Sequence, residues 1–76
     1  MKLADAAEEV LKDSNGASLT FKEITNRALA LGLISPRSDA PWTYMAAAIR
    51  KDSRRRQQLG NGPRFESAEG GRVRLV

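Results

Sequence analysis

The sequence contains no cysteine and no histidine, and each absence excludes a class of chemistry. Without cysteine, the chain has no disulfide framework and no thiolate metal site. Without histidine, it lacks the residue on which most zinc sites, Ser-His and Cys-His nucleophiles and imidazole acid–base catalysis depend. Acidic side chains remain, but Asp5, Glu8, Glu9 and Asp13 share one amphipathic segment, with no sign of a pocket, and are most simply solvated. We therefore expect no enzymatic activity, cofactor, metal or small-molecule substrate.

Long apolar runs are also missing. No run approaches the length of a membrane span and no secretory signal is visible, so we expect an intracellular, reducing location and no membrane partner. The location would be cytoplasmic, at the nucleoid, for a bacterial protein and nuclear for a eukaryotic one. With 76 residues, the chain is expected to form one small domain, residues 1–76, with a modest core.

Basic residues, in contrast, are abundant and unevenly distributed. Residues 1–40 hold five basic and six acidic residues, whereas residues 41–76 hold eight basic and three acidic residues, a balance of +5. Seven of these eight are arginine, whose planar fork of donors suits phosphates and guanine edges. Such localised positive charge is typical of a nucleic-acid interface.

The segment PWTYMAAAIRKDSRRR, residues 41–56, shows where this charge lies. Apolar residues recur at spacings of three and four, which predicts a helix with an inward stripe of Trp42, Met45, Ala46 and Ile49. The outward face is small and neutral at its start and cationic at its end, with five cations against a single acid: Arg50, Lys51, Arg54, Arg55 and Arg56 against Asp52. The alternative is a solvated charge run at a helix C-terminus, which the helix dipole favours. That alternative explains two or three cations better than five.

Two more helices are predicted upstream of this segment. Apolar periodicity predicts one over about residues 2–13 and another over about 21–31, whose inward residues would be Phe21, Ile24, Ala28 and Leu31. Between them, residues 17–19 are expected to be extended.

Capping signals set the helix boundaries. Thr20-x-x-Glu23 is a capping box for the second helix, and Asn15-Gly16 and Gly32 are signals for helix C-termini. After a turn over residues 35–40, Pro41 is suited to the first position of the third helix, which we expect to run to about residue 55.

The end of the chain has the pattern of a β-hairpin, a wing over about residues 64–76. A two-residue Gly-Gly turn or a three-residue loop would connect its strands. The three-residue loop pairs Phe65 with Leu75 and Glu66 with Arg74, which places the apolar side chains on one face, so we favour that register. Three helices followed by a hairpin, with the short segment as a third strand, predict a mainly helical α+β fold, the winged helix-turn-helix.

Four stretches resemble one family. LADAAEEVLKDSNGASLTFKEI, ALALGLIS, PWTYMAAAIRKDSRR and RFESAEGGRVRLV are similar, in order and spacing, to the HARE-HTH domain. This winged helix occurs in bacterial RNA polymerase delta subunits, restriction-enzyme-associated proteins and Additional-sex-combs-like chromatin regulators. The resemblance implies a non-catalytic module for DNA binding or chromatin targeting, with a role in transcription regulation.

We therefore predict binding to double-stranded DNA, with the third helix in the major groove and the wing on phosphates. The expected contacts are Thr43, Tyr44, Ala47, Arg50, Lys51, Arg54, Arg55, Arg56, Arg64, Arg72 and Arg74. Trp42, at the start of an apolar stripe, is expected in the core. The alternative function is a protein-interaction module that docks on a transcription, restriction or chromatin complex. RNA binding ranks lower because aromatic stacking platforms are scarce.

Overall fold

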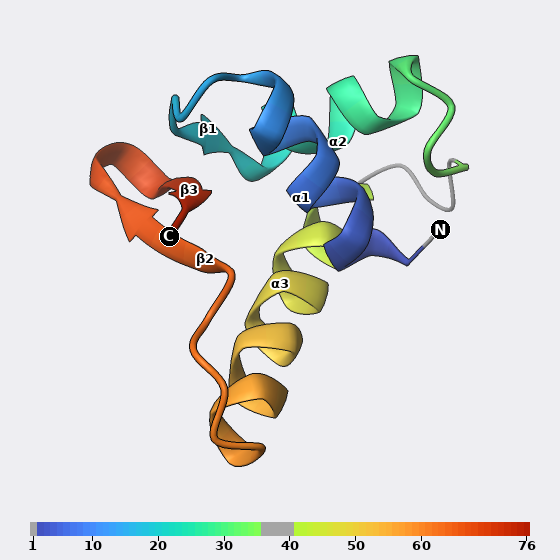
Figure 1. The fold of residues 1–76 in the computed structure, drawn as a ribbon. Helices are drawn as coiled ribbons and strands as arrows, with labels where there is room; N and C mark the ends of the chain where they lie inside the picture. The colour runs from blue at the N-terminus through green and yellow to red at the C-terminus, as the bar shows by residue number, and fades with distance from the viewer. Residues whose placement is uncertain (1, 36–40) are drawn as a thin grey trace.

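Three α-helices and a small antiparallel sheet form the fold in the computed structural model, which describes residues 2–35 and 41–76 (Figure 1). The helices are α1 (Leu3–Asp13), α2 (Phe21–Ala30) and α3 (Pro41–Gln58), and the strands are β1 (Leu19–Thr20), β2 (Phe65–Ala68) and β3 (Arg72–Leu75). This order confirms the predicted winged helix-turn-helix. None of the described helices is long and apolar enough to cross a bilayer. Apart from Ser35, the turn predicted over residues 35–40 lies outside the described part of the chain.

The predicted capping box starts α2. The Thr20 side chain accepts a hydrogen bond from the Glu23 backbone N–H at 3.1 Å, and the Glu23 carboxylate accepts one from the Thr20 backbone N–H at 3.0 Å. This second bond is the main reason that the pKa of Glu23 lies below its ordinary value. Two backbone donors at the helix start are thereby satisfied, which fixes the point where β1 turns into α2.

Replacing Thr20 by alanine should lower the free energy of unfolding by about 1 kcal/mol, because one backbone donor of α2 loses its acceptor. Denaturant unfolding followed by circular dichroism measures the change. Thr20→Ser keeps the hydroxyl and serves as the control, with a much smaller expected loss. Equal losses from alanine and serine would show that the methyl group of Thr20, rather than the cap, stabilises this junction.

The third helix is longer than predicted, because it continues three residues past position 55 to Gln58. The cause is its termination signal. Gly60 takes a positive φ of 78°, the Asn61 N–H donates to the Arg56 carbonyl oxygen at 2.8 Å, and the Gly60 N–H donates to that of Gln57. This is the Schellman pattern, which places the helix end two residues before its glycine. The glutamines expected to begin a loop therefore form the last turn of α3.

The sheet has the order β1-β3-β2, with both pairings antiparallel. Phe65 pairs with Leu75 and Glu66 with Arg74, which confirms the register of the three-residue loop. The loop is a short 3₁₀ turn, Glu69–Gly71, in which both glycines have positive φ. The short strand before α2 joins β3 as predicted, although it lies at Leu19–Thr20 rather than at 17–19.

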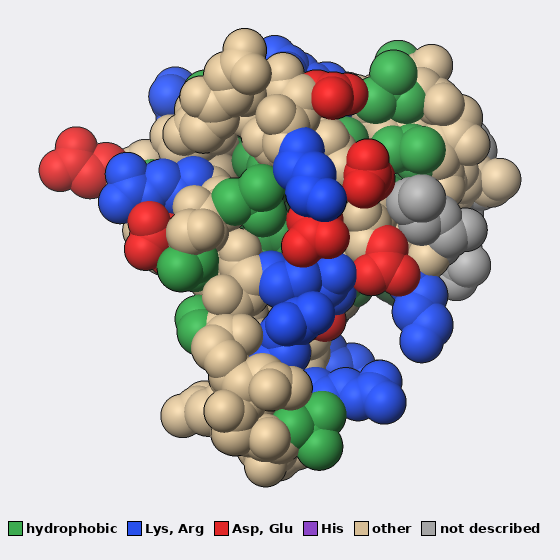
Figure 2. All heavy atoms as spheres, in the orientation of Figure 1, with side chains coloured by type: hydrophobic (Ala, Val, Ile, Leu, Met, Phe, Trp, Pro, Cys, Tyr) green, Lys and Arg blue, Asp and Glu red, His purple; other side chains and the backbone are tan. Residues whose placement is uncertain are grey.

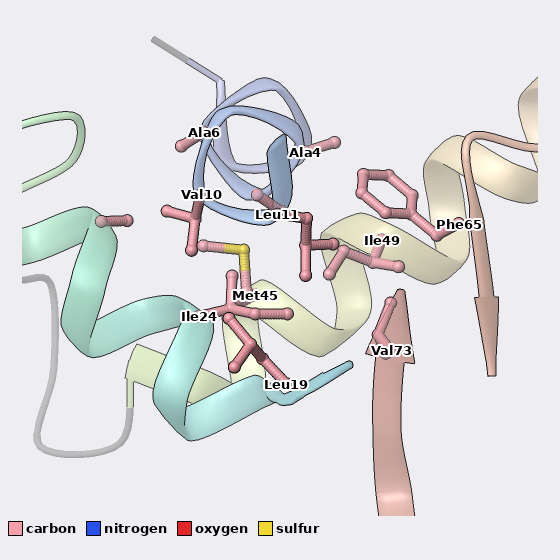
Figure 3. Packing of buried hydrophobic residues seen from close by; sticks show 12 residues of the cluster. Ala4, Ala6, Val10, Leu11, Leu19, Ile24, Met45, Ile49, Phe65 and Val73 are labelled. Carbon is pink, nitrogen blue, oxygen red and sulfur yellow. The ribbon is translucent and has the colours of Figure 1, made fainter. Parts of the chain in front are cut away.

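The core lies where all three helices meet the inner face of the wing (Figure 3). Val10 and Leu11 from α1, Ile24 from α2 and Met45 and Ile49 from α3 converge there, and Phe65 and Val73 close it from the sheet. Thr25 is also buried, since its hydroxyl donates to the Phe21 carbonyl oxygen at 2.7 Å.

Two predicted core residues lie elsewhere. Leu31 is 56% exposed, because α2 ends at Ala30 and the chain reverses at Gly32, so that Leu33 and Ile34 pack against the core instead. Trp42 is only half-buried and does not belong to the core cluster. The ammonium group of Lys22 lies 5.2 Å from its ring centroid, so the indole covers a surface cation at the edge of the fold.

Candidate nucleic-acid interface

The cations of α3 lie on the half of the helix that extends beyond the packed core (Figure 1). The first half supplies the buried residues, which end at Ile49, and the second half begins with Arg50. Figure 2 shows Lys and Arg side chains gathered over this second half, with Asp and Glu side chains beside them on the side of α1. The projecting half of α3 thus presents several cations within a few helical turns.

One row of these cations faces the wing. Arg50 and Arg54 are one helical turn apart, and both line a groove between α3 and the sheet. Arg72, at the start of β3, lines the same groove. Three predicted contact residues from two separate elements therefore share one surface.

A second row faces α1. Lys51 and Arg55, again one turn apart, line a shallow hollow together with Lys2 and Asp52. Lys2 was not predicted as a contact. It precedes α1 alone in the sequence, without a neighbouring cation, and only the packing of α1 on α3 brings it to this row.

Five predicted contacts carry charge that no carboxylate neutralises. Within residues 2–35 and 41–76, no ion pair is formed by Arg50, Lys51, Arg54, Arg55 or Arg72. All five are exposed. We call these five residues the cationic face. Unpaired surface cations attract polyanions more strongly than paired ones, because no bound carboxylate has to be displaced.

Arg64 has different surroundings from the phosphate expected of it. Its guanidinium donates twice to Asp52, with Nε to Oδ2 at 3.1 Å, and its Nη1 donates to Asp5 Oδ1 at 3.0 Å. Glu8 Oε1 lies 3.7 Å from the same Nη1. Only 15% of the Arg64 side chain is exposed. The residue is therefore occupied by an ion cluster that joins the start of the wing to α1 and α3.

The cluster also revises the interpretation of the acidic residues. Asp5 and Glu8, expected to be simply solvated, face Arg64. Asp52, the single acid among the cations of α3, is the main partner of Arg64, and this hydrogen bonding holds the pKa of Asp52 below its ordinary value. The same contacts raise the pKa of Arg64, so its charge is permanent. Asp52 therefore has a structural role within the basic segment.

Two further predicted contacts are paired with acids. Arg56 Nε lies 3.4 Å from Asp52 Oδ2, and Arg74 donates to Glu66, its cross-strand neighbour. Both are more exposed than Arg64, so these pairs are of the weak surface kind. They reduce the local positive charge without fixing the fold.

The three uncharged contacts lie on the first half of α3. Thr43, Tyr44 and Ala47 are all exposed. Thr43 and Ala47 continue the row of Arg50 and Arg54 toward the helix N-terminus, since the spacings are four, three and four residues. A helix laid in a groove along this row would meet it first with small side chains and then with cations.

The family comparison gives one match, to the HARE-HTH domain, described as an ASXL and restriction-endonuclease helix-turn-helix domain, over residues 1–76. Neither the comparison with curated proteins nor the comparison with solved structures gives a match. HARE-HTH domains are a helix-turn-helix family of the DNA-binding type and are not a catalytic family. Because the match covers the whole chain and the three helices and three-stranded sheet agree with it, this chain belongs to the HARE-HTH family.

Proposed function

We propose that this chain binds double-stranded DNA through the cationic face. The observation that carries the proposal is that these five exposed cations, on α3 and β3, have no carboxylate partner among the described residues. A chain that needed arginine only for solubility would gain nothing from leaving these five together and unpaired. DNA offers each of them a phosphate, and binding releases the counterions condensed on the duplex.

In this proposal α3 lies in the major groove, which has the width to admit a helix. The row from Thr43 through Ala47 faces the base edges, and Arg50 and Arg54 reach the flanking phosphates. Arg72 carries the contact to the wing side, and Tyr44, Lys51 and Arg55 follow the other strand. Arg64 supports the interface from below and makes no phosphate contact. Roles in transcription regulation and the location in the cell stay predictions.

The salt dependence of duplex binding tests this proposal. With five phosphate contacts, a plot of log association constant against log salt concentration should have a slope of about −4.5, since each contact contributes about −0.9. Fluorescence anisotropy of a labelled short duplex, titrated at several salt concentrations, measures it. A slope near zero would reject DNA binding through the cationic face. Binding that also survived high salt would favour the protein-docking alternative.

A further inference from the structure

A groove of about 530 Å³ lies between α3 and the sheet. Its floor is apolar, formed by Phe21, Ile49, Phe65 and Val73. Its rim is cationic, formed by Arg50, Arg54 and Arg72. We call it the wing groove. DNA phosphates would use the rim alone, so the floor has no part in the proposed function.

Small side chains keep the wing groove open. Ser53 on α3 and Ser67, Ala68 and Gly71 in the wing line it, and none of them reaches across. Larger residues at these positions would let the wing pack against the projecting half of α3. The space is therefore a consequence of the sequence at these four positions.

The charge around the wing groove favours an acidic ligand. Three of the lining residues are arginines without an ion pair among the described residues, and the one lining acid, Glu66, is held by Arg74. A ligand that joins acidic groups to apolar groups would match both the rim and the floor. A peptide of acidic and apolar residues has this chemistry.

A nucleic-acid strand fits the floor less well. The Arg50 guanidinium lies over the Phe21 ring, 5.9 Å from its centroid. Phe65 is buried, and the Arg64 guanidinium lies 5.6 Å from its ring centroid. Neither ring offers an open face on which a base could stack, and such stacking is the main apolar contact of single strands with proteins.

The wing adds a place for an extended backbone. All four residues of β2 line the wing groove, and β2 is an edge strand of the described sheet. An edge strand has unpaired backbone donors and acceptors along one side, which extended peptides use in β-augmentation. Alternate side chains of such a peptide would point toward the apolar floor.

We propose that the wing groove binds a short extended segment of a partner protein in which acidic and apolar residues alternate. The segment pairs its carboxylates with Arg50, Arg54 and Arg72 and places its apolar side chains on the floor. Peptide binding stands on the groove alone. Competition between the peptide and DNA follows in addition, and rests on the proposed function, because both ligands use the same arginines.

The test uses the fluorescein-labelled peptide Asp-Leu-Glu-Phe-Asp-Leu-Glu-Phe and the variant Ser67→Leu, which fills the groove without changing any charge. Wild type should bind the peptide saturably, and Ser67→Leu should weaken it by roughly tenfold or more. Ser67→Ala leaves the groove open and should retain the affinity within about twofold. Ser53→Leu fills the groove from α3 and takes the place of Ser67→Leu if that variant fails to fold.

Two outcomes would overturn the proposal. One is the absence of saturable peptide binding, or equal binding by wild type and a folded filled-groove variant. The other is that filling the groove weakens an eight-nucleotide oligothymidylate rather than the peptide, which would assign the groove to single strands. Duplex affinity, measured in parallel, should stay within about twofold in Ser67→Leu, because the distant cations are retained. Failure of duplex binding alone would reject the proposed function and leave the peptide site standing.

Discussion

Replacing Arg64 by methionine should lower the free energy of unfolding by about 2–3 kcal/mol, between the values for surface pairs and for fully buried pairs. Methionine keeps much of the apolar stem but removes a guanidinium that is bonded to Asp52 and Asp5. Three carboxylates, those of Asp5, Glu8 and Asp52, would then face one another without the cation that now joins them. For a domain of this size, the loss is a large part of the total stability. Urea unfolding followed by circular dichroism measures it.

Arg74→Met is the matched control for this prediction. Arg74 also pairs with a carboxylate, but about half of its side chain is exposed. Its removal should lower the free energy of unfolding by at most about 0.5 kcal/mol. If the two variants lost the same stability, the Arg64 cluster would contribute no more than an ordinary surface pair.

The pH dependence of stability should show the same cluster. The pKa of Asp52 is lower in the folded chain than its ordinary value of 3.8, chiefly because of its hydrogen bonds with Arg64. The ionised carboxylate therefore stabilises the fold above that value, and this contribution disappears as the pH falls from 3.8 through the lowered pKa. Wild type should lose more stability than Arg64→Met between about pH 5 and about pH 2, as measured by thermal unfolding. Parallel pH profiles would contradict the assignment.

Replacing Lys51, Arg54 and Arg55 together by glutamine should weaken duplex binding by up to about 500-fold at 0.1 M salt, since each lost contact removes about 0.9 of a decade. The slope against log salt should become shallower, from about −4.5 to about −1.8. All three side chains are exposed and lie on the projecting half of α3, so the fold should retain its stability. Because phosphates carry no sequence information, the loss should be similar for duplexes of different sequence. Anisotropy titrations at several salt concentrations measure both quantities.

The chain offers a control with the same change in net charge. Lys12, Arg56 and Arg74 are each paired with a carboxylate, and their joint replacement by glutamine also removes three positive charges. This variant should lose much less affinity, because its cations are already neutralised or lie away from the cationic face. Equal losses in the two triple variants would mean that net charge alone, and not the unpaired face, governs binding.

Local signals in the sequence were sufficient for most of the fold. The capping box at Thr20 and the glycine at position 32 are short-range devices, and both lie where they were predicted. The wing register followed from the alternation of apolar residues on two strands. The end of α3 was predicted three residues early because a glycine-rich loop masked a helix-ending signal that forms two residues beyond the last helical residue.

The role of Arg64 could not be predicted in the same way. Its partners Asp5 and Asp52 lie 59 and 12 residues away in the sequence, and only the packing of α1 on α3 brings them together. An arginine just before a basic wing has the same local pattern whether it meets phosphate or carboxylate. A lone acid within a run of cations, as at Asp52, is the one signal that pointed to an internal pair.

The most direct test of the DNA-binding account is a backbone amide chemical-shift titration of the chain with a short duplex. The account expects the largest changes at residues 47–55 of α3 and at Arg72, with small changes around Arg64 and on the outer side of α1. Saturable changes confined to residues 2–35, or no changes at all, would contradict the claim that the cationic face binds DNA.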